Sequence, residues 1–411
     1  MITGQRRFLT PWPARGASGR PLRVAAVITR LEGGAGALAL RGAMAMDPEA
    51  FELTIVTGSG DRLFDAATAA RLEIIVEPSL RAPIAPRSDV QALRRLTALF
   101  GRRNFDVVHT HCAKAGTVGR LAARRAGVPR MVHTFHGFPF HEFQSMARKQ
   151  AYVSIERRLG RFTDVALCVG AGVAAEAVRR QLVAPERIQT IGVVVDGRDV
   201  AAASASARTP QARRRARIAL GLPIDGTVIG AVGRLTYQKA PEDFLAAMQR
   251  LGRPEATGVW VGGGELAERI GRQARSLSGA RVVLAGERTD VLDVLPAFDV
   301  FALPSRYEGL PTAVVEAMNC GVPVVATAVN AVSDVVVPGE TGLLVPPHRP
   351  DLMAGAIRYL LDSPADAARM AANARTRLTG RYAETALRDA LAAAYAPAAR
   401  ADGPVKWRPA P

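Results

Sequence analysis

Short apolar runs alternate with amphipathic segments along two stretches of this chain. In the first half, six runs rich in β-branched and other apolar residues predict buried strands, over 22–29, 51–57, 72–76, 106–109, 130–135 and 164–169. Between several of them, apolar residues recur at helical spacing, over 90–100, 113–126 and 143–162. Strands that alternate with helices predict βαβ units and a parallel sheet buried on both faces.

This alternation stops once and then restarts. Residues 201–217 are small, polar and then basic, which is typical of a linker that runs into a helix. Beyond it, the pattern predicts strands over 227–232, 258–261, 281–284, 300–303 and 322–326, and helices over 242–250, 266–278, 312–319 and 351–362. We therefore expect two doubly wound α/β domains of similar size, whose ligands bind beyond the carboxyl ends of the strands.

The same pattern sets the expected boundaries along the chain. We expect a disordered basic arm over 1–20, a first domain over 21–200, a linker over 201–212, a second domain over 213–380, an amphipathic helix over 381–397 and a frayed tail over 398–411.

Positive charge is the unusual feature of the composition. The 411 residues include 54 Lys and Arg against 37 Asp and Glu, a net charge of +17, while a hydrophobic fraction of 48% excludes disorder as the main state. The excess is +12 over residues 1–205 and +5 over 206–411. Such a chain could bind nucleic acid, a membrane surface or an anionic substrate. Because aromatic residues make up only 5% and no aromatic and basic platform appears, we expect no nucleic acid partner.

The cysteines and the apolar segments bear on the compartment. Cys112, Cys168 and Cys320 form no CxxC pair, so we expect neither a disulfide framework nor a zinc site, and a reducing cytoplasm fits best. Residues 1–20 lack the apolar segment of a secretory signal, and no run approaches the roughly 18 apolar residues of a membrane span. We expect a cytoplasmic protein, either soluble or peripheral on the inner face of the plasma membrane.

Two features follow strands of the first half. The glycines of Gly33–Gly36 resemble a dinucleotide-binding loop only loosely, because no acidic residue ends the second strand; a loop near a phosphate or sugar, or a simple turn, are the alternatives. Five of the six histidines lie within 109–141, but no carboxylate or cysteine completes a metal site, so no metal is expected. His136 directly follows the strand 130–135 and could hydrogen-bond a substrate or serve as a turn residue.

Two further features follow strands of the second half. Arg234 and Lys239 flank a loop before a helix that starts at Pro241, which could form an anion site for a diphosphate; a solvated basic loop is an equal alternative. Glu308 and Glu316 lie around the start of the helix 312–319, where they could accept hydrogen bonds from sugar and ribose hydroxyls. A glycosidase acid and nucleophile pair, or plain capping and surface carboxylates, are the competing interpretations.

With these features, the chain resembles glycosyltransferase family 4, a family of retaining enzymes with the GT-B fold. The resemblance covers nearly all of 22–397 and is carried by EGLPTAVVEAMNCGVPVVAT at 308–327, GRLTYQK at 233–239, VVLAGERTDVLDVLPAFDVFALPS at 282–305 and HTFHG at 133–137. It implies two Rossmann-like domains facing across a cleft, with the last helix crossing back to the first domain. It also implies a nucleoside-diphosphate-sugar donor on the second domain, an acceptor on the first, and neither metal nor cofactor.

The resemblance also implies roles for individual residues. Glu308 would contact the donor sugar and His136 the reacting carbon, as the catalytic pair. The implied donor-binding residues are Arg234 and Lys239 on the diphosphate, Gly309, Leu310, Pro311 and Thr312 on sugar or phosphate, Glu316 on the ribose and Gly34 over the diphosphate; the implied acceptor-side residues are Gly137 and Lys114. The chain departs from the family in Lys239-Ala240, where Lys-Gly is common, and in the apolar residues Ala35, Ala37 and Ala39.

The predicted function is retaining transfer of a sugar to a hydroxyl of a glycan or lipid-linked glycan, in bacterial polysaccharide or glycolipid synthesis. A nucleotide-sugar epimerase or hydrolase on the same fold is one alternative, and a non-catalytic basic protein that binds membrane or nucleic acid is another. The basic face of 143–162, beside the aromatic residues of 135–141, also predicts contact with an anionic membrane, with a solvated helix face as the alternative.

Overall fold

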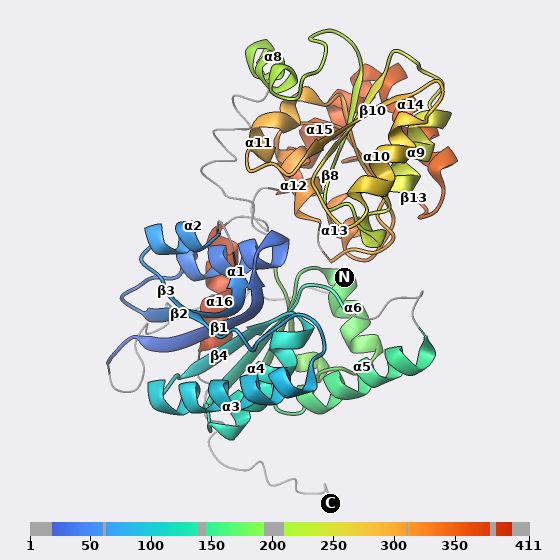
Figure 1. The fold of residues 1–411 in the computed structure, drawn as a ribbon. Coiled ribbons are helices and arrows are strands. Elements are labelled where there is room, and N and C mark those ends of the chain that lie inside the picture. Colours follow the sequence, from blue (N-terminus) through green and yellow to red (C-terminus); the bar gives the residue numbers. More distant parts are fainter. Residues whose placement is uncertain are drawn as a thin grey trace, which may run out of the picture.

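The chain forms two parallel sheets, each covered by helices on both faces and stacked one above the other (Figure 1). The structure is a computed structural model that describes residues 19–60, 63–138, 145–192, 209–309, 311–378 and 384–396. Residues 1–18 of the predicted arm, the predicted tail and most of the predicted linker lie outside these residues, as does Leu310. The predicted pair of doubly wound domains is confirmed.

The first sheet has seven parallel strands in the order β3-β2-β1-β4-β5-β6-β7. Its strands are β1 Leu22–Leu31, β2 Phe51–Gly60, β3 Glu73–Val76, β4 Val107–His111, β5 Arg130–Phe135, β6 Val165–Cys168 and β7 Ile188–Thr190. The helices between them are α1 Gly33–Ala45, α2 Leu63–Ala69, α3 Pro86–Arg103, α4 Ala113–Arg125, α5 Met146–Gly160, α6 Ala171–Arg179 and the 3-10 turn Pro185–Arg187. The central strand β4 is wholly buried, as expected where helices cover both faces.

The second sheet has six parallel strands in the order β10-β9-β8-β11-β12-β13. Its strands are β8 Val228–Val232, β9 Thr257–Val261, β10 Arg281–Gly286, β11 Val300–Leu303, β12 Val324–Thr327 and β13 Leu343–Val345. Its helices are α8 Pro210–Ala219, α9 Pro241–Arg250, α10 Ala267–Arg275, α11 Val291–Val294, α12 Thr312–Asn319, α13 Val332–Val335, α14 Pro350–Asp362 and α15 Pro364–Leu378, with 3-10 turns at Tyr237–Lys239 and Leu295–Ala297.

One predicted feature near the start of the chain is wrong. Strand β1 runs to Leu31, two residues beyond the predicted end, so only Glu32 separates it from Gly33. The segment Gly33–Gly36 is the first turn of α1 and not a separate glycine-rich loop. A Cβ on Gly36 would lie 2.9 Å from the carbonyl carbon of Leu31, so this tight strand-to-helix turn requires glycine there.

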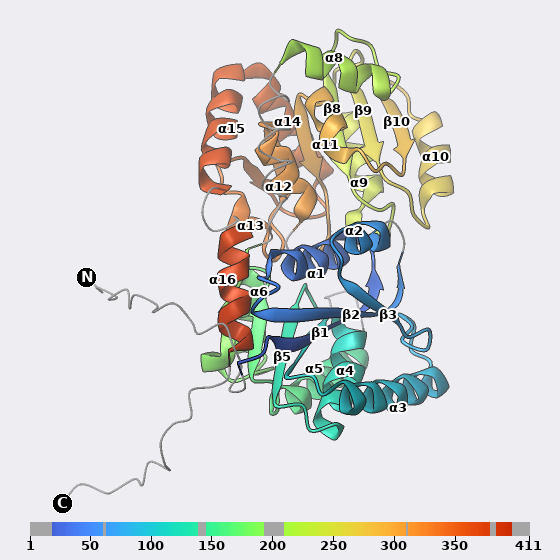
Figure 2. The same cartoon turned by 90° about the vertical axis from the view of Figure 1, so that its left-hand side faces the viewer.

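The predicted crossing of the last helix is confirmed. Helix α16, Glu384–Tyr395, lies against the first domain, far in sequence from its neighbours there (Figure 2). The hydroxyl of Tyr395 is 2.8 Å from Nδ1 of His109, and Arg130 donates from Nε to the carbonyl of Ala394 at 2.7 Å. The C-terminal helix therefore braces the sheet that carries the histidines.

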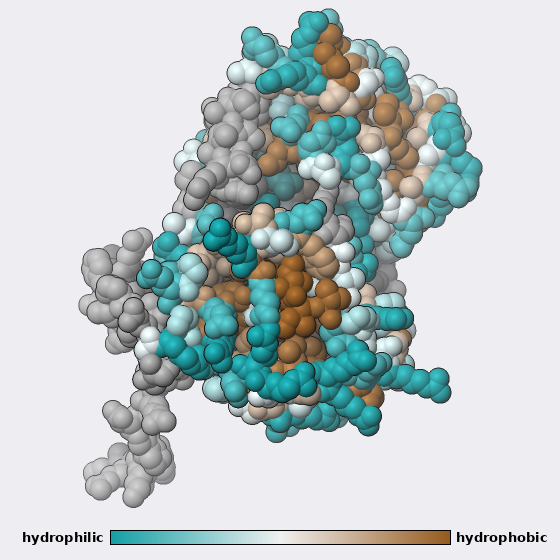
Figure 3. All heavy atoms as spheres, turned by 60° about the vertical axis from the view of Figure 1, so that its left-hand side comes forward, coloured by the Kyte–Doolittle hydropathy of each residue, from teal (hydrophilic) through white to brown (hydrophobic). Residues whose placement is uncertain are grey.

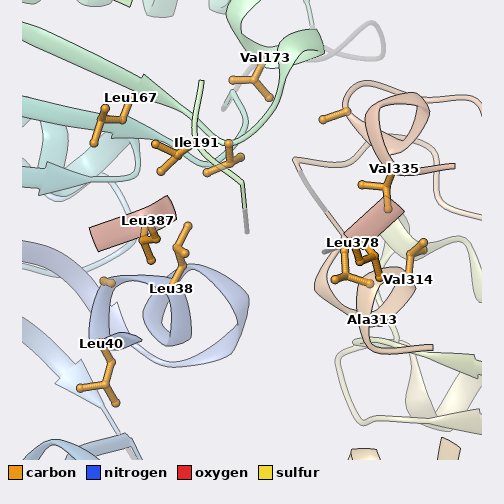
Figure 4. Close-up of a cluster of buried hydrophobic side chains, with 14 of the residues drawn as sticks. Leu38, Leu40, Leu167, Val173, Ile191, Ala313, Val314, Val335, Leu378 and Leu387 are labelled. Atoms are coloured by element: carbon orange, nitrogen blue, oxygen red, sulfur yellow. The ribbon is translucent and has the colours of Figure 1, made fainter. Parts of the chain in front are cut away.

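One connected cluster of buried apolar side chains draws on both domains. Figure 4 shows its two parts: Leu38 of α1 and Leu387 of α16 in the first domain, and Val314 of α12 and Leu378 of α15 in the second. In the space-filling view the domains join at a waist, and a hydrophobic area on the first domain is bordered by hydrophilic residues (Figure 3).

Candidate active site

The carboxylate of Glu308 is the best-buried acid at the carboxyl edge of the second sheet. It lies between β11 and α12, and the residue is only 6% exposed. Its Oε1 lies 2.5 Å from Nζ of Lys239 and accepts a hydrogen bond from Oγ of Ser305 at 2.6 Å. The only described side chain bonded to Oε2 is Gln238, at 3.4 Å. One carboxylate oxygen is therefore held by a cation and a hydroxyl, while the other is weakly bonded and suited to a ligand hydroxyl.

The backbone next to Lys239 adopts a conformation that favours glycine. Ala240 has φ 50° and ψ 54°, is fully buried and is the residue before α9. This left-handed conformation costs a residue with a Cβ roughly 1–2 kcal/mol, which glycine avoids. The methylenes of Lys239 pass over Gly233, where a Cβ would lie 3.2 Å from Cδ of the lysine. The lysine is thereby directed at Glu308.

Arg306 joins the loop of Glu308 to the loop of Lys239. Its backbone N–H donates to the carbonyl of Gln238 at 2.8 Å, and its Nη1 donates to the carbonyl of Tyr237 at 2.6 Å. The guanidinium also lies 4.2 Å from the centre of the Tyr237 ring. Sequence reasoning missed this residue, and the only signal for it was its place two residues before Glu308.

Arg234 lies on the same loop as Lys239 but is exposed. Its side chain forms no hydrogen bond or ion pair within the described ranges of the chain. A charged guanidinium that projects from this loop is available to an anionic ligand.

The start of α12 and Glu316 face the first domain. Pro311 precedes the first residue of α12, Thr312, so the free N–H groups of the first turn lie beside the loop of Glu308. Burial raises the pKa of Glu316, and the charge of Arg41 on α1 acts in the opposite direction. Arg41 belongs to the other domain, so Glu316 is held at the contact between the two.

Glycines bring the two halves of the predicted site together. A Cβ on Gly309 would lie 1.8 Å from the carbonyl oxygen of His136, and a Cβ on Gly137 would lie 3.5 Å from Cα of Gly309. A Cβ on Gly34 would lie 3.5 Å from Oγ1 of Thr312. The predicted residues of the first domain therefore meet the predicted loop of the second, with α1 facing α12 across the contact (Figure 2).

His136, which is partly exposed, is the end of a row of imidazoles that continues into the buried His111 and His109. Its Nε2 lies 3.0 Å from Nδ1 of His111, whose ring in turn contacts His109 with centroids 4.1 Å apart. Burial lowers the pKa of His136 to about 4 and that of His109 to about 3, and it takes the pKa of His111 well below its usual range. These histidines are uncharged at neutral pH, so His136 can exchange hydrogen bonds with a ligand but does not supply a proton as an acid.

No metal site accompanies these histidines in the part of the chain that the structure describes. Within it, no group of three or more His, Cys, Asp or Glu side chains is placed to hold a metal ion. His141, the fifth histidine of the sequence cluster, lies outside the described residues.

Comparison with known proteins identifies the family of the chain. The model of Glycosyltransferase Family 4 matches residues 32–197, and the model of Glycosyl transferases group 1 matches 212–377. The UDP-Gal:alpha-D-GlcNAc-diphosphoundecaprenol alpha-1,3-galactosyltransferase of Escherichia coli is 31% identical over 288 residues, 69% of this chain and 73% of that protein. A D-inositol 3-phosphate glycosyltransferase of Mycobacterium leprae is 33% identical over 304 residues, 71% of this chain and 69% of that protein.

The chain belongs to glycosyltransferase family 4. The predicted enzyme class is thereby confirmed. Solved structures similar to this glycosyltransferase include HepE of Anabaena in complex with UDP and glucose, with a TM-score of 0.78, 19% identity and coverage of 90% of this chain and 98% of that one. The sucrose-phosphate synthase of Thermosynechococcus elongatus has a TM-score of 0.75, 21% identity and coverage of 91% and 98%. At these identities the likeness shows the fold, and the predicted GT-B fold is confirmed.

Lys114 has a contact in this glycosyltransferase that the sequence did not indicate. Its Nζ lies 2.5 Å from Oδ1 of Asp89 and donates to the carbonyl of Pro83 at 3.1 Å. The ammonium thus joins the start of α4 to α3 and to the loop before it. Its charge is already paired, so its acceptor-side role remains a prediction.

Proposed function

We propose that this glycosyltransferase moves a sugar, with retention of configuration, from a nucleoside-diphosphate-sugar to a hydroxyl of a glycan or lipid-linked glycan. The contact of Lys239 with Glu308, the exposed Arg234 on the loop of Lys239, and the start of α12 after Glu308 support this proposal. Cations and free N–H groups at one place stabilise the charge that develops on a departing diphosphate. The donor of the E. coli relative is, by its name, a UDP-sugar.

Each residue has a part in the proposed reaction. The bond between the anomeric carbon and the diphosphate oxygen breaks, with Lys239 and Arg234 bearing the developing charge. The acceptor oxygen forms its bond to that carbon from the same face, and its proton passes to an oxygen of the departing diphosphate. Glu308 accepts a hydrogen bond from the donor sugar through its weakly bonded Oε2, Glu316 binds the ribose, and neutral His136 lies beside the reacting carbon.

The proposed acceptor is a sugar attached to a lipid diphosphate, and its use places the enzyme in polysaccharide or glycolipid synthesis. The E. coli relative acts, by its name, on GlcNAc-diphosphoundecaprenol. The larger positive excess of the first half of the chain suits an anionic acceptor on the first domain.

A transfer assay tests the donor and the acceptor together. We expect the full chain to release UDP from UDP-galactose only when GlcNAc-diphosphoundecaprenol is added, and to give a product with the α configuration of the donor. UDP-glucose, UDP-GlcNAc and GDP-mannose, each with and without this acceptor, serve as the comparison panel. Free sugar or an epimerised nucleotide sugar without acceptor would indicate a hydrolase or an epimerase instead.

We also propose that the enzyme contacts an anionic membrane surface through α5. Arg148 and Arg158 are exposed on this helix, and so are Met146 and Ile155, at 65% and 40%. Basic residues beside exposed apolar ones suit the interface of an anionic bilayer. None of the described helices is both long and apolar enough to span a membrane.

Vesicle flotation tests this contact. We expect the protein to float with phosphatidylglycerol vesicles and not with phosphatidylcholine vesicles, and Arg148→Glu with Arg158→Glu to weaken binding by at least about 30-fold, at ~1 kcal/mol for each basic residue removed. Arg214→Glu with Arg215→Glu is the matched control, because these exposed arginines lie on α8 at the opposite end of the molecule (Figure 1). Equal losses in the two double variants would contradict a specific role for α5.

A further inference from the structure

Asn330 holds the main chain of Glu308 from a separate loop. It lies between β12 and α13, and its Oδ1 accepts a hydrogen bond from the backbone N–H of Glu308 at 3.0 Å. Because only the oxygen of the amide can accept, this bond fixes the orientation of the side chain. Asn330 has φ 45°, a left-handed conformation that asparagine tolerates better than most residues.

The same loop is pressed against α6 of the first domain. A Cβ on Gly172 would lie 2.9 Å from both the carbonyl carbon and the oxygen of Asn330. The N–H of Gly172 donates to Oδ2 of Asp334 at 3.2 Å, and a Cβ on Gly170 would lie 2.5 Å from that oxygen. Figure 1 shows α13 beside α6 at this contact.

We propose that Asn330 is a positioning residue for sugar transfer, which makes the placement of Glu308 depend on the contact between the two domains. The inference rests on the proposed role of Glu308 at the donor sugar. Asn330 is held on one side by the backbone of α6 and on the other by the N–H of Glu308. When the domains meet, Glu308 is fixed relative to the donor; when they separate, the loop of Asn330 loses its support from the first domain.

Replacing Asn330 tests the hydrogen bond itself. Asn330→Gly keeps the left-handed backbone and removes the acceptor, and we expect kcat/KM for transfer from UDP-galactose to fall about tenfold, the scale of one hydrogen bond. Asn330→Asp keeps an acceptor oxygen and the backbone, so its kcat/KM should stay within about threefold. The affinity for UDP, which lacks the sugar, should remain unchanged in both variants. Transfer by Asn330→Gly within twofold of the wild type, or an equal loss in Asn330→Asp, would overturn the inference.

Replacing Gly172 tests the link to the first domain. Alanine suits the first turn of α6, but its Cβ would meet backbone atoms of Asn330 that cannot easily shift. We expect Gly172→Ala to lower transfer at least tenfold while UDP affinity is kept, because the proposed partners of the nucleotide, Lys239, Arg234 and Glu316, all lie on the second domain. Gly355→Ala on α14 is the matched control, since its Cβ would meet nothing within 4 Å. Transfer by Gly172→Ala equal to that of the control would overturn the coupling.

A parallel measurement on Glu308→Gln separates this inference from the proposed function. If Glu308→Gln transfers sugar normally, the proposed role of Glu308 is wrong and the inference fails with it. If Glu308→Gln is inactive while Asn330→Gly and Gly172→Ala are normal, the proposed function stands and the inference alone is overturned.

Discussion

Replacing Lys239 by methionine is expected to lower sugar transfer by about 100- to 1000-fold and to destabilise the protein as well. The kinetic loss follows from removing a cation where the diphosphate charge develops, and loss of one such stabilising group costs this factor in other enzymes. The loss of stability follows from Glu308, whose side chain is 5% exposed beside the 17% exposed lysine. A buried carboxylate that loses its partner costs about 3–5 kcal/mol.

A double variant separates the two effects. Lys239→Met with Glu308→Gln leaves no uncompensated charge, so the free energy of unfolding, measured by urea titration, should recover most of the loss. Transfer should remain at the level of the single variant or below it, because neither the cation nor the carboxylate is restored. Lys149→Met on α5 is the control variant. It removes the same charge from the first domain and should keep the affinity for UDP. Recovery of transfer together with stability would show that Lys239 acts only as the structural partner of Glu308.

Part of this site could be predicted because its residues and the pattern that identifies them lie within one short stretch of sequence. The run that includes Glu308, Thr312 and Glu316 spans the end of a strand and the start of a helix, and the observed α12 has the predicted bounds. The apolar runs of the long strands are equally local. The three-residue strands β7 and β13 were missed, since three residues are too few to show a period.

Other parts depend on contacts between segments far apart in the chain. Asn330 bonds the N–H of a residue 22 positions away, and Arg306 bonds a carbonyl 69 positions away. Neither residue belongs to a pattern with its partner in the sequence. The ion pair of Lys114 is of the same kind, because Asp89 on α3 is adjacent to Lys114 on α4 only once the two helices have packed together. Side chains that position the catalytic groups are thus visible only once the loops are placed.

Lowering the pH from 7 to 5 is expected to cost the folded protein at least about 4 kcal/mol of stability. His109 and His136 have pKa values of about 3 and about 4 in the fold, because burial disfavours their charged forms. Their unfolded pKa is ~6.5, so between pH 6.5 and these values the unfolded chain binds protons that the folded chain does not. Stability is therefore complete above pH 6.5 and falls as the pH falls, by about 2 kcal/mol per histidine between pH 7 and 5.

Other titratable groups also change how the stability depends on pH. Burial also takes the pKa values of His111 and His133 well below their usual range, which adds losses of the same sign. Burial raises the pKa of Glu316, which acts in the opposite direction because the folded chain then holds a proton that the unfolded chain releases. A single carboxyl cannot offset four imidazoles, so the net loss below pH 6.5 should remain.

Urea unfolding at pH 5, 6 and 7 measures the loss, and one variant tests whether a histidine causes it. His136→Gln should reduce the loss between pH 7 and 5 by about 2 kcal/mol, because it removes one of the imidazoles whose pKa the fold lowers. A stability that does not change between pH 7 and 5 would mean that these histidines take up protons in the fold. His136 would then carry a positive charge beside the departing diphosphate in mildly acid solution, and its proposed role as a neutral hydrogen-bonding group would be wrong.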